Sequence, residues 1–266
     1  MTIISLYNNK GGVAKTTTAI TTASCLVQLG KRVLLLDLDP QANASDAAGI
    51  GEEGNVSLLL ELLLTSRGSD PFSMGQVDGL RRPSSIIGCD VIPASPALDQ
   101  FAEQAAQGTN REFRLQTILA PLRSSYDYIL IDCPPSLSLL TMNALAASDY
   151  VVIPCDSSKY ALTGMSNLIT KYNKIRESCN QTLEIAGILN TKVEMRAQTS
   201  RLSREKLADY FGDLLFTSYI PKSASVEKSQ YAGETLLTYD RHSPALAAYQ
   251  SFTKELIQRV STKKNQ

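Results

Sequence analysis

The chain has 266 residues, of which 43% are hydrophobic and 20% charged, and its 26 basic and 26 acidic side chains leave no net charge. This composition is typical of a globular protein, and because the sequence has no run of 18 apolar residues, a membrane-spanning helix is excluded. Five cysteines without a CxxC pair argue against a disulfide framework and a zinc site, so we expect them to pack as small apolar side chains.

One domain is the simplest organisation for a chain of this length. No sharp change of composition divides residues 1–260, and residues 261–266 read as a frayed polar tail. The first residues lack the basic and apolar segments of a cleaved signal. We therefore expect a single domain over 1–260, a short tail and a cytoplasmic location.

Short apolar runs alternate with helical patterns along the chain. Residues 2–7 predict a buried strand, a loop follows, and small and apolar residues at helical spacing predict a helix over 15–29 that ends at Gly30. The uninterrupted run VLLLD at 33–37 is typical of a central parallel strand that is covered on both faces. Similar runs recur at 90–93, 128–132, 150–154, 185–190 and 216–220.

Helical patterns separate most of these runs, at residues 96–122, 137–147, 161–179, 199–211 and 244–260. The LLLELLL segment at 58–64 predicts a further core helix, whereas residues 66–88 show no period and predict a surface loop. Strands that alternate with helices favour the α/β class, with a doubly wound, mostly parallel twisted sheet and helices on both of its faces.

The segment KGGVAKTT lies between the first expected strand and the first expected helix. It departs from the usual phosphate-loop pattern GxxxxGKS/T, because Asn9 and Ala14 stand where that pattern has glycine. The context still predicts a phosphate-binding loop, since backbone N–H groups and a helix N-terminus converge there. The members of this loop are Lys10, Gly11, Gly12, Val13, Ala14, Lys15, Thr16 and Thr17.

The residue types in this loop suit different parts of a nucleoside triphosphate. Gly11 and Gly12 leave room for close approach of the backbone to phosphate oxygens. We expect Lys15 to bridge the β- and γ-phosphates, the Thr16 hydroxyl to ligate Mg²⁺, and Thr17 to donate to the α-phosphate.

Three aspartates lie at the carboxyl ends of expected strands, where a doubly wound sheet binds its ligands. Asp37 and Asp39 are expected to take different positions, one facing the phosphate site and the other at the strand's exit. Asp132 ends the apolar run YDYILID, as does a carboxylate that holds Mg²⁺ through water in phosphate-loop proteins. From its position alone, a helix cap or a turn former is an equal alternative for Asp132.

Together with these motifs, the segments 34–43, 91–103, 126–154 and 218–256 resemble the ParA/MinD family of deviant Walker A ATPases, and the similarity runs nearly end to end. The chain looks most like small ParA-type partition ATPases without an N-terminal helix-turn-helix domain, because the phosphate loop begins so close to residue 1. The resemblance implies ATP and Mg²⁺ as cofactors, ATP hydrolysis with slow basal turnover, and an ATP-sandwich homodimer.

The resemblance also implies roles for single residues. Lys10 matches the signature lysine that reaches across the dimer to the partner's phosphates, which would couple dimerisation to catalysis as an arginine finger does. Asp39 matches the residue that orients the attacking water, and Asp132 matches the Mg²⁺-linked switch carboxylate. Asp37 resembles a neighbouring position that contacts the water shell of the metal.

Three further positions bear on the nucleotide. Asn190 and Pro221 match positions that contact adenine in relatives, although a turn residue at a strand end is an alternative for Asn190. Ala14 departs from the family, in which most members have glycine there. If the loop requires a positive φ at Ala14, the alanine costs on the order of 1 kcal/mol.

Non-specific DNA binding is a further property that the resemblance implies, through basic residues near 189–207. The residues concerned are Arg196, Arg201 and Arg204, and Lys192 and Lys206 lie in the same stretch. Residues 134–266 carry 16 basic and 12 acidic side chains, which permits a local basic face, although such a charge run alone is usually a solvated helix face. An ATP dimer doubles the phosphate contacts of a monomer, so ATP would switch DNA affinity on.

The implied role is cargo positioning by a nucleoid-associated dimer, with a ParB-like or other adaptor that stimulates hydrolysis. The cargo could be a plasmid, a chromosome origin or a protein body such as a carboxysome. A MinD-like membrane switch is the alternative, but the C-terminal segment has no bulky apolar residue beyond Leu256 of the kind a membrane-bound amphipathic helix needs. A relative of the nitrogenase iron protein is disfavoured, because Cys133 lies in a DCPPS context common in partition ATPases.

Overall fold

The computed structural model describes residues 1–51, 58–158 and 161–264. These residues form one sheet in the order β3-β4-β2-β5-β1-β6-β7-β8, in which β3 runs antiparallel to β4 and the other neighbouring strands are parallel. The strands are β1 (Thr2–Leu6), β2 (Val33–Asp37), β3 (Arg82–Pro83), β4 (Cys89–Ile92), β5 (Tyr128–Asp132), β6 (Tyr150–Asp156), β7 (Glu184–Val193) and β8 (Leu215–Pro221).

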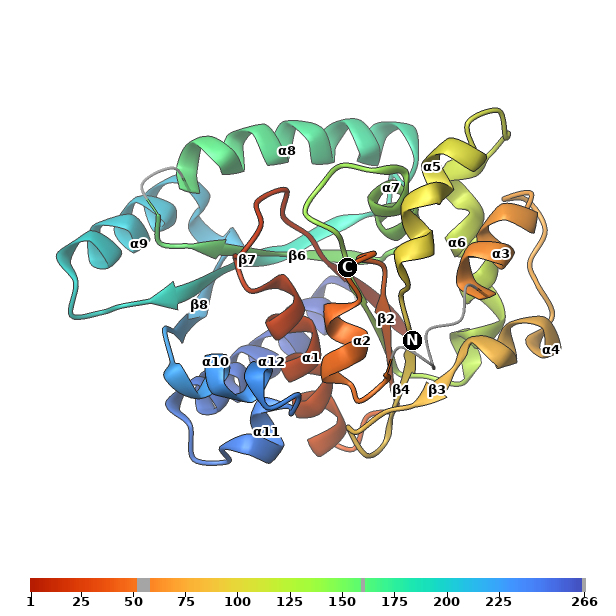
Figure 1. Ribbon diagram of the computed structural model, residues 1–266. Helices are drawn as coiled ribbons and strands as arrows, with labels where there is room; N and C mark the ends of the chain where they lie inside the picture. The colour runs from red at the N-terminus through yellow and green to blue at the C-terminus, as the bar shows by residue number, and fades with distance from the viewer. Residues whose placement is uncertain (52–57, 159–160, 265–266) are drawn as a thin grey trace.

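Helices cover both faces of this sheet (Figure 1), as expected for the doubly wound class. On one face lie α1 (Lys15–Gln28), α2 (Asn43–Ala47), α10 (Ala224–Tyr231), α11 (Leu236–Tyr239) and α12 (Pro244–Lys264). The other face carries α5 (Phe101–Gln104), α6 (Arg114–Leu119), α7 (Leu139–Ala147) and α8 (Ala161–Ser178). The remaining helices are α3 (Leu58–Thr65), α4 (Met74–Val77) and α9 (Gln198–Phe211).

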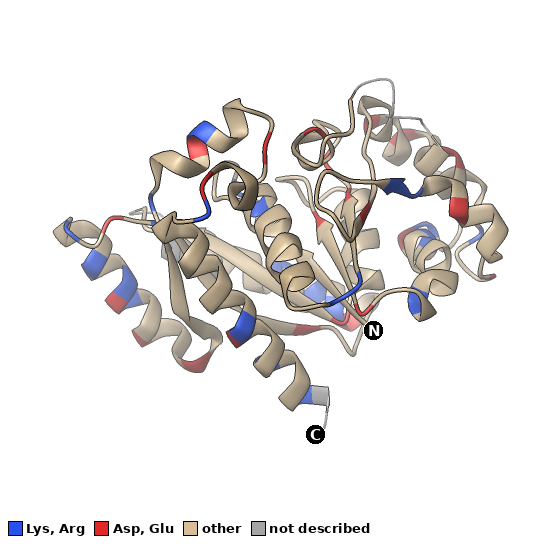
Figure 2. Cartoon of the chain, turned by 90° about the horizontal axis from the view of Figure 1, so that it is seen from below, with Lys and Arg blue, Asp and Glu red and all other residues tan. Residues whose placement is uncertain are grey.

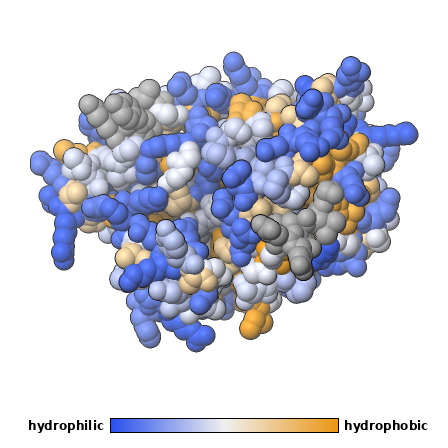
Figure 3. Space-filling model, in the orientation of Figure 1, coloured by the Kyte–Doolittle hydropathy of each residue, from blue (hydrophilic) through white to orange (hydrophobic). Residues whose placement is uncertain are grey.

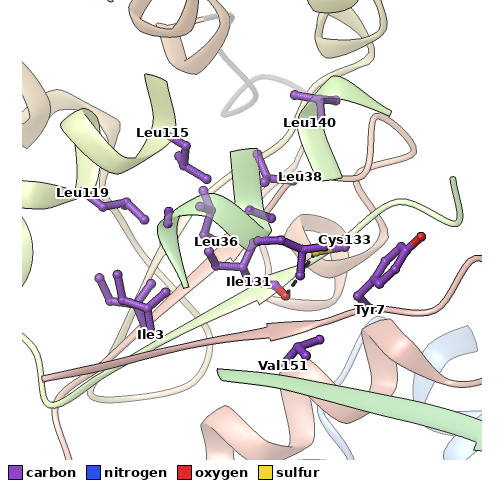
Figure 4. Close-up of a cluster of buried hydrophobic side chains, with 14 of the residues drawn as sticks. Ile3, Tyr7, Leu36, Leu38, Leu115, Leu119, Ile131, Cys133, Leu140 and Val151 are labelled. Atoms are coloured by element: carbon purple, nitrogen blue, oxygen red, sulfur yellow. Dashed lines mark hydrogen bonds between the residues drawn. The ribbon is translucent and has the colours of Figure 1, made fainter. Parts of the chain in front are cut away.

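Successive residues of the central strands pack into two different cores. Ile3 and Leu34 belong to one buried cluster, and the next residues, Ile4 and Leu35, belong to the other. Figure 4 shows the first cluster, in which side chains from β1, β2, β5 and β6 pack with residues of α6. Because both faces are buried, these strands have apolar residues at most positions, which explains the nearly continuous apolar runs of the sequence.

The helix expected over residues 96–122 is wrong. This segment consists of α5 and α6, with 3₁₀ turns at Pro96–Gln100, Arg111–Phe113 and Ala120–Ser124. Between the two helices, Asn110 adopts a φ of 51°, which is left-handed and cannot continue a helix. The helical spacing located residues that are buried, such as Leu115 and Ile118, but it does not detect the turn between the two helices.

Two other segments are more ordered than the sequence predicts. Residues 66–88, expected as a loop, contain α4, a 3₁₀ turn at Asp78–Leu80, and β3. Helix α12 continues to Lys264, through residues expected to form a frayed tail. Lys263 Nζ donates to the Ile185 carbonyl at 2.9 Å and lies 3.1 Å from Glu184 Oε2, so contacts with β7 hold this last turn.

The register of the sheet brings the carboxyl ends of β1, β2 and β5 together. Asp132 of β5 lies opposite Asp37 of β2 on one side and opposite Leu6 of β1 on the other. Paired strands lie about 4.8 Å apart, so the two aspartates and the chain that leaves β1 share one small area. Parallel α/β sheets bind their ligands at this edge.

Candidate functional site

The loop that follows β1 is anchored to two neighbouring strands. Asn8 Nδ2 donates to the Pro154 carbonyl of β6 at 2.7 Å, and Asn8 Oδ1 accepts from the Lys10 amide at 3.0 Å. On the far side of the loop, the Thr191 hydroxyl of β7 donates to the Val13 carbonyl at 3.0 Å. The loop backbone is therefore held before any ligand binds, as a phosphate site built from backbone N–H groups requires.

Ala14 precedes α1 in a left-handed conformation, with φ 66° and ψ 34°. The condition stated in the sequence analysis is met, because the loop does place a positive φ at this alanine, and the cost of about 1 kcal/mol stays a prediction. Gly12 also has a positive φ, of 74°, which glycine adopts without strain. Loops that combine right- and left-handed residues in this way can form concave sites of backbone N–H groups that bind anions.

Lys15 begins α1 and is buried, with 7% of its surface exposed. Its Nζ donates to the Lys10 carbonyl at 3.2 Å, so the lysine bends back over the loop. Burial lowers the pKa of Lys15, and the nearby charges of Asp132 and Asp39 oppose that shift. A buried ammonium group next to a helix N-terminus is a site for an anion such as a phosphate.

Asp132 ends β5 beside Asp37 of β2 and is fully buried, so it does not itself line the cavity described below. Neither of its carboxylate oxygens has a hydrogen-bond partner of normal geometry among the residues that the structure describes. Burial raises the pKa of Asp132 well above its usual value and the charge of Asp37 adds to the shift, whereas Thr16 and Lys15 oppose it. A buried carboxylate in this condition fits a bound cation, because carboxylate oxygens are the ligands that Mg²⁺ prefers.

Over the described ranges, no group of three or more histidine, cysteine or acidic side chains could hold a metal ion by itself. Mg²⁺ does not need such a cage, because it usually keeps several waters and binds through one or two carboxylates and the phosphates of its substrate. Asp132 and the Thr16 hydroxyl, two of the three predicted metal-site residues, fit this kind of site. Both carboxylate oxygens of the third, Asp37, already accept hydrogen bonds within the protein.

Asp37 and Asp39 do occupy different positions. Asp37 is fully buried; its Oδ2 accepts from the Ser45 amide and hydroxyl, both at 2.8 Å, and its Oδ1 accepts from the Asp39 amide at 3.1 Å. Burial raises the pKa of Asp37 to about 6. Asp39 lines the cavity described below, whereas the contacts of Asp37 fix the start of α2 and the backbone of Asp39.

Lys10 lies at the rim of the loop with its side chain 46% exposed. Its Nζ is 2.6 Å from Asp156 Oδ2 and 2.9 Å from Ser158 Oγ. Burial raises the pKa of Asp156, but the hydrogen bonds from Lys10 and Ser158 outweigh that effect and hold it below its usual value. Asp156 was missed in the sequence, although it directly follows the apolar run of β6.

A cavity of about 720 Å³ opens in front of the loop. Its volume lies in the range of small-molecule sites. The predicted site residues that line it are Gly11, Gly12, Ala14, Lys15, Thr16, Thr17, Asp39 and Pro221. The opposite wall was not predicted beyond Pro221 and comes from the segment after β8, with Lys222, Val226 and Gln230.

Asn190 does not line this cavity, because it is fully buried in β7, where it pairs with Cys155 of β6 and Tyr219 of β8. Its Nδ2 donates to the Cys155 carbonyl at 3.0 Å and to Ser157 Oγ at 3.3 Å. Its Oδ1 has no hydrogen-bond partner within the described parts of the chain. Asn190 therefore makes two structural hydrogen bonds through Nδ2 and has one free acceptor, Oδ1.

The three arginines predicted for DNA binding differ in their surroundings. Arg196 and Arg201 are exposed near and on α9, where Figure 2 shows basic and acidic residues interspersed. Arg204 is partly buried: its Nη2 donates to the Thr217 carbonyl at 2.7 Å, and its guanidinium lies 4.9 Å from the ring centroid of Tyr219. Arg204 is therefore less available to a partner than Arg196 and Arg201, because its guanidinium contacts β8, and its role in DNA binding stays a prediction.

Comparisons with known proteins agree with this geometry. Residues 1–185 match the family model described as an AAA domain. The chain is 37% identical to the chromosome partitioning protein ParA of Myxococcus xanthus, over 98% of this chain and 89% of that protein. It is 35% identical to the sporulation initiation inhibitor protein Soj of Bacillus subtilis, over 96% and 97% respectively.

Similar structures have been solved as well. The crystal structure of cobyrinic acid a,c-diamide synthase from Mycobacterium smegmatis with bound ADP and magnesium has a TM-score of 0.83 to this fold and is 27% identical in sequence. The similarity covers 98% of this chain and 96% of that one. The similarities in sequence and in structure agree with the expected fold, and the chain belongs to the ParA/Soj family of partition ATPases.

Proposed function

We propose that this chain binds Mg-ATP in the cavity in front of the phosphate loop and hydrolyses it as a homodimer. The observation that carries the proposal is the buried Asp132 carboxylate, which lacks a hydrogen-bond partner of normal geometry among the described residues. Such a group costs on the order of a few kcal/mol in a protein interior, and a cation nearby offsets that cost. The cobyrinic acid a,c-diamide synthase from M. smegmatis has a similar fold and was crystallised with bound ADP and magnesium, which supports the same class of ligand here.

The phosphates of ATP would lie on the backbone N–H groups of Gly11, Gly12, Val13 and Ala14. Lys15 would bridge the β- and γ-phosphates as a point charge. When bound, Mg²⁺ supplies charge neutralisation at the phosphate oxygens.

The remaining polar residues would divide the other tasks. Thr16 would ligate the Mg²⁺ and Asp132 would hold it through water. Asp39 would orient the attacking water, since it lines the cavity, whereas Asp37 would support Asp39 and α2 from behind. Pro221, which lines the cavity, is a proposed contact for adenine, and Asn190 would contact the base once its buried Oδ1 becomes accessible.

Lys10 would complete the site of a second copy. Its side chain is half exposed at the loop rim, where it is held by Asp156 of its own chain. An ion pair at this exposure is worth about 1 kcal/mol or less, so the phosphates of a partner subunit could displace it. Hydrolysis would then require assembly, and basal turnover would be slow.

DNA binding is proposed for the exposed basic side chains near α9, namely Lys192, Arg196, Arg201 and Lys206. Contacts with phosphates are independent of sequence, and a dimer would present this set twice. Affinity for DNA would therefore rise on ATP-dependent dimerisation. An adaptor bound to a plasmid, a chromosome origin or a protein body would stimulate hydrolysis and release the dimer from the nucleoid.

A membrane switch of the MinD kind is less compatible with α12. The apolar residues of this helix, Phe252, Leu256 and Val260, are buried in the core. On the face seen in Figure 3, hydrophobic side chains occur in small separate groups rather than over one continuous area. None of the helices in the described part of the chain has the length and hydrophobicity to span a bilayer.

Light scattering after size exclusion would test the proposal. We expect the protein to be monomeric without nucleotide and with Mg-ADP, and dimeric with saturating Mg-ATP. Lys10→Ala should remain monomeric and hydrolyse ATP more slowly, while Lys254→Ala, which removes an exposed lysine of α12, should behave as the wild type. A wild-type protein that stays monomeric in Mg-ATP, or a Lys10→Ala variant that dimerises normally, would contradict the dimer model.

Retention on duplex DNA of arbitrary sequence would test the second part. The wild type should be retained only with ATP, and Arg201→Ala should weaken retention without changing dimerisation. Equal retention of the wild type with ATP and without nucleotide would exclude a switch through assembly.

A further inference from the structure

The C-terminal segment reaches the first turn of α1 through two adjacent threonines. Gln230, in the last turn of α10, donates from Nε2 to Thr17 Oγ1 at 2.9 Å. Thr18 Oγ1 lies 3.2 Å from the hydroxyl of Tyr249 in α12. The partners are 213 and 231 residues apart in the sequence, so neither contact follows from closeness along the chain.

The two contacts lie in different environments. Thr18 and Tyr249 are fully buried, and their contact belongs to the packing of α1 against α12. Gln230 is exposed, and it lines the same cavity as Thr16 and Thr17. A solvated glutamine adds little to the packing of the core. We therefore expect its hydrogen bond to affect ligand binding in the cavity.

The direction of the hydrogen bond determines what Thr17 can do. A hydroxyl has one proton to donate and two lone pairs that accept, whereas an amide N–H can only donate. The Thr17 oxygen therefore accepts from Gln230, and its proton stays available. No other hydrogen bond of the Thr17 hydroxyl is found among the residues described, so the proton is not committed to a protein acceptor.

We propose that Gln230 is a positioning residue for nucleotide binding, which orients the Thr17 hydroxyl so that its proton points to the α-phosphate. This inference rests on the proposed function, in which Thr17 donates to that phosphate. ATP and ADP share the α-phosphate, so Gln230 contributes equally to the affinity for both nucleotides. Its hydrogen bond also joins α10, on the wall of the cavity opposite the loop, to the phosphate end of the site.

Calorimetric titration of the full chain with Mg-ADP and with a non-hydrolysable ATP analogue measures this contribution. Gln230→Ala should raise the Kd of both nucleotides about 3- to 10-fold, the range for loss of one hydrogen bond. Gln230→Glu keeps the shape of the side chain but reverses the bond, since a carboxylate accepts the Thr17 proton. It should therefore weaken binding more than alanine does.

The chain offers a matched control in Gln250, whose Nε2 donates to Gln28 Oε1 at 3.2 Å. This contact also joins the C-terminal segment to α1, but at the end of α1 that is far from the loop. Gln250→Ala should leave both Kd values unchanged. If Gln250→Ala weakened binding as much as Gln230→Ala, general packing of α1 would explain the effect and the proposal would be wrong.

A double-mutant cycle with Thr17→Val separates positioning from a direct contact. If Gln230 acts through Thr17, Gln230→Ala should cause no further loss in the Thr17→Val background. The inference is overturned if Gln230→Ala binds both nucleotides within twofold of the wild type, or if its effect is the same in both backgrounds. Should Gln230→Ala fold poorly by its thermal midpoint, the isosteric Gln230→Glu variant carries the same test.

Failure of this inference can be told apart from failure of the proposed function. If the wild type binds no nucleotide, or if Lys15→Ala binds as tightly as the wild type, the proposed site itself is wrong. If Lys15→Ala abolishes binding while Gln230→Ala does not change it, only the role of Gln230 is wrong.

Discussion

Replacing Ala14 by glycine is expected to raise the free energy of unfolding of the ligand-free protein. Ala14 holds φ 66° and ψ 34°, a conformation in which the Cβ of an L-residue costs about 1–2 kcal/mol. Glycine removes that cost but loses about 0.4–1 kcal/mol more conformational entropy on folding than alanine does. The net gain is therefore about 0.5–1 kcal/mol, the difference between the two effects.

Urea unfolding and thermal scans would measure this gain. The midpoint should rise in urea with an unchanged m-value, and the Tm should rise by about 2 °C for a chain of this size. Ala208→Gly is the matched control, because Ala208 is exposed within α9 and glycine there should destabilise the protein by about 0.5–1 kcal/mol. If Ala14→Gly is as destabilising as Ala208→Gly, the argument from backbone strain is refuted.

The buried carboxyls predict how stability depends on pH. Burial raises the pKa values of Asp37 and Asp132, so both hold their protons to higher pH in the folded protein than in the unfolded chain. The free energy of unfolding of the ligand-free protein should therefore fall as pH rises from about 4 to 6, the interval between the ordinary and the raised pKa of Asp37. Asp132→Asn should weaken this decline in urea titrations, and an unchanged slope would contradict it. Arg204→Ala should lower the free energy of unfolding by about 1–2 kcal/mol, as expected for loss of a charged hydrogen bond at a strand edge, whereas the exposed Arg201→Ala should leave it within about 0.5 kcal/mol. Mg-ATP at 100 times its Kd should stabilise the wild type by about 2.7 kcal/mol, and Lys15→Ala should lose most of this shift in Tm.

The sheet could be predicted because its strands are covered on both faces. Continuous apolar runs such as the one at 33–37 have few other uses in a globular protein, and the parallel arrangement then brings Asp37, Asp39 and Asp132 to one edge. The prediction of one helix over 96–122 was wrong because the apolar spacing of this segment does not show where its backbone turns. Periodicity reports which residues are buried, and Asn110 breaks the backbone without changing that pattern.

The missed contacts of the site join residues that are far apart in the sequence. Lys10 and Asp156 are 146 residues apart, and each alone is an ordinary charged residue. In the sequence Arg204 is one member of a basic run, but its position in the structure is set by a hydrogen bond to a carbonyl of β8, and the charge pattern gives no information on that contact. Sequence patterns therefore predicted the strands and the loop well, while the pairing of polar side chains between elements required the structure.

The two buried polar groups of the site that lack hydrogen-bond partners suggest how ligand binding and stability are linked. Nearly all buried polar groups in proteins are hydrogen-bonded, yet in the described residues both oxygens of Asp132 and Oδ1 of Asn190 are not. In the proposed complex, Asp132 holds the cation, and Asn190 would bind the base once its buried Oδ1 becomes accessible, so each group recovers its interaction from a different part of the ligand. Because Asp132 needs the metal, Mg-ATP should stabilise the fold more than ATP in the presence of a chelator does. That difference should become smaller in Asp132→Asn, since its neutral side chain has no charge for the cation to balance while Thr16 and the phosphates still hold the metal.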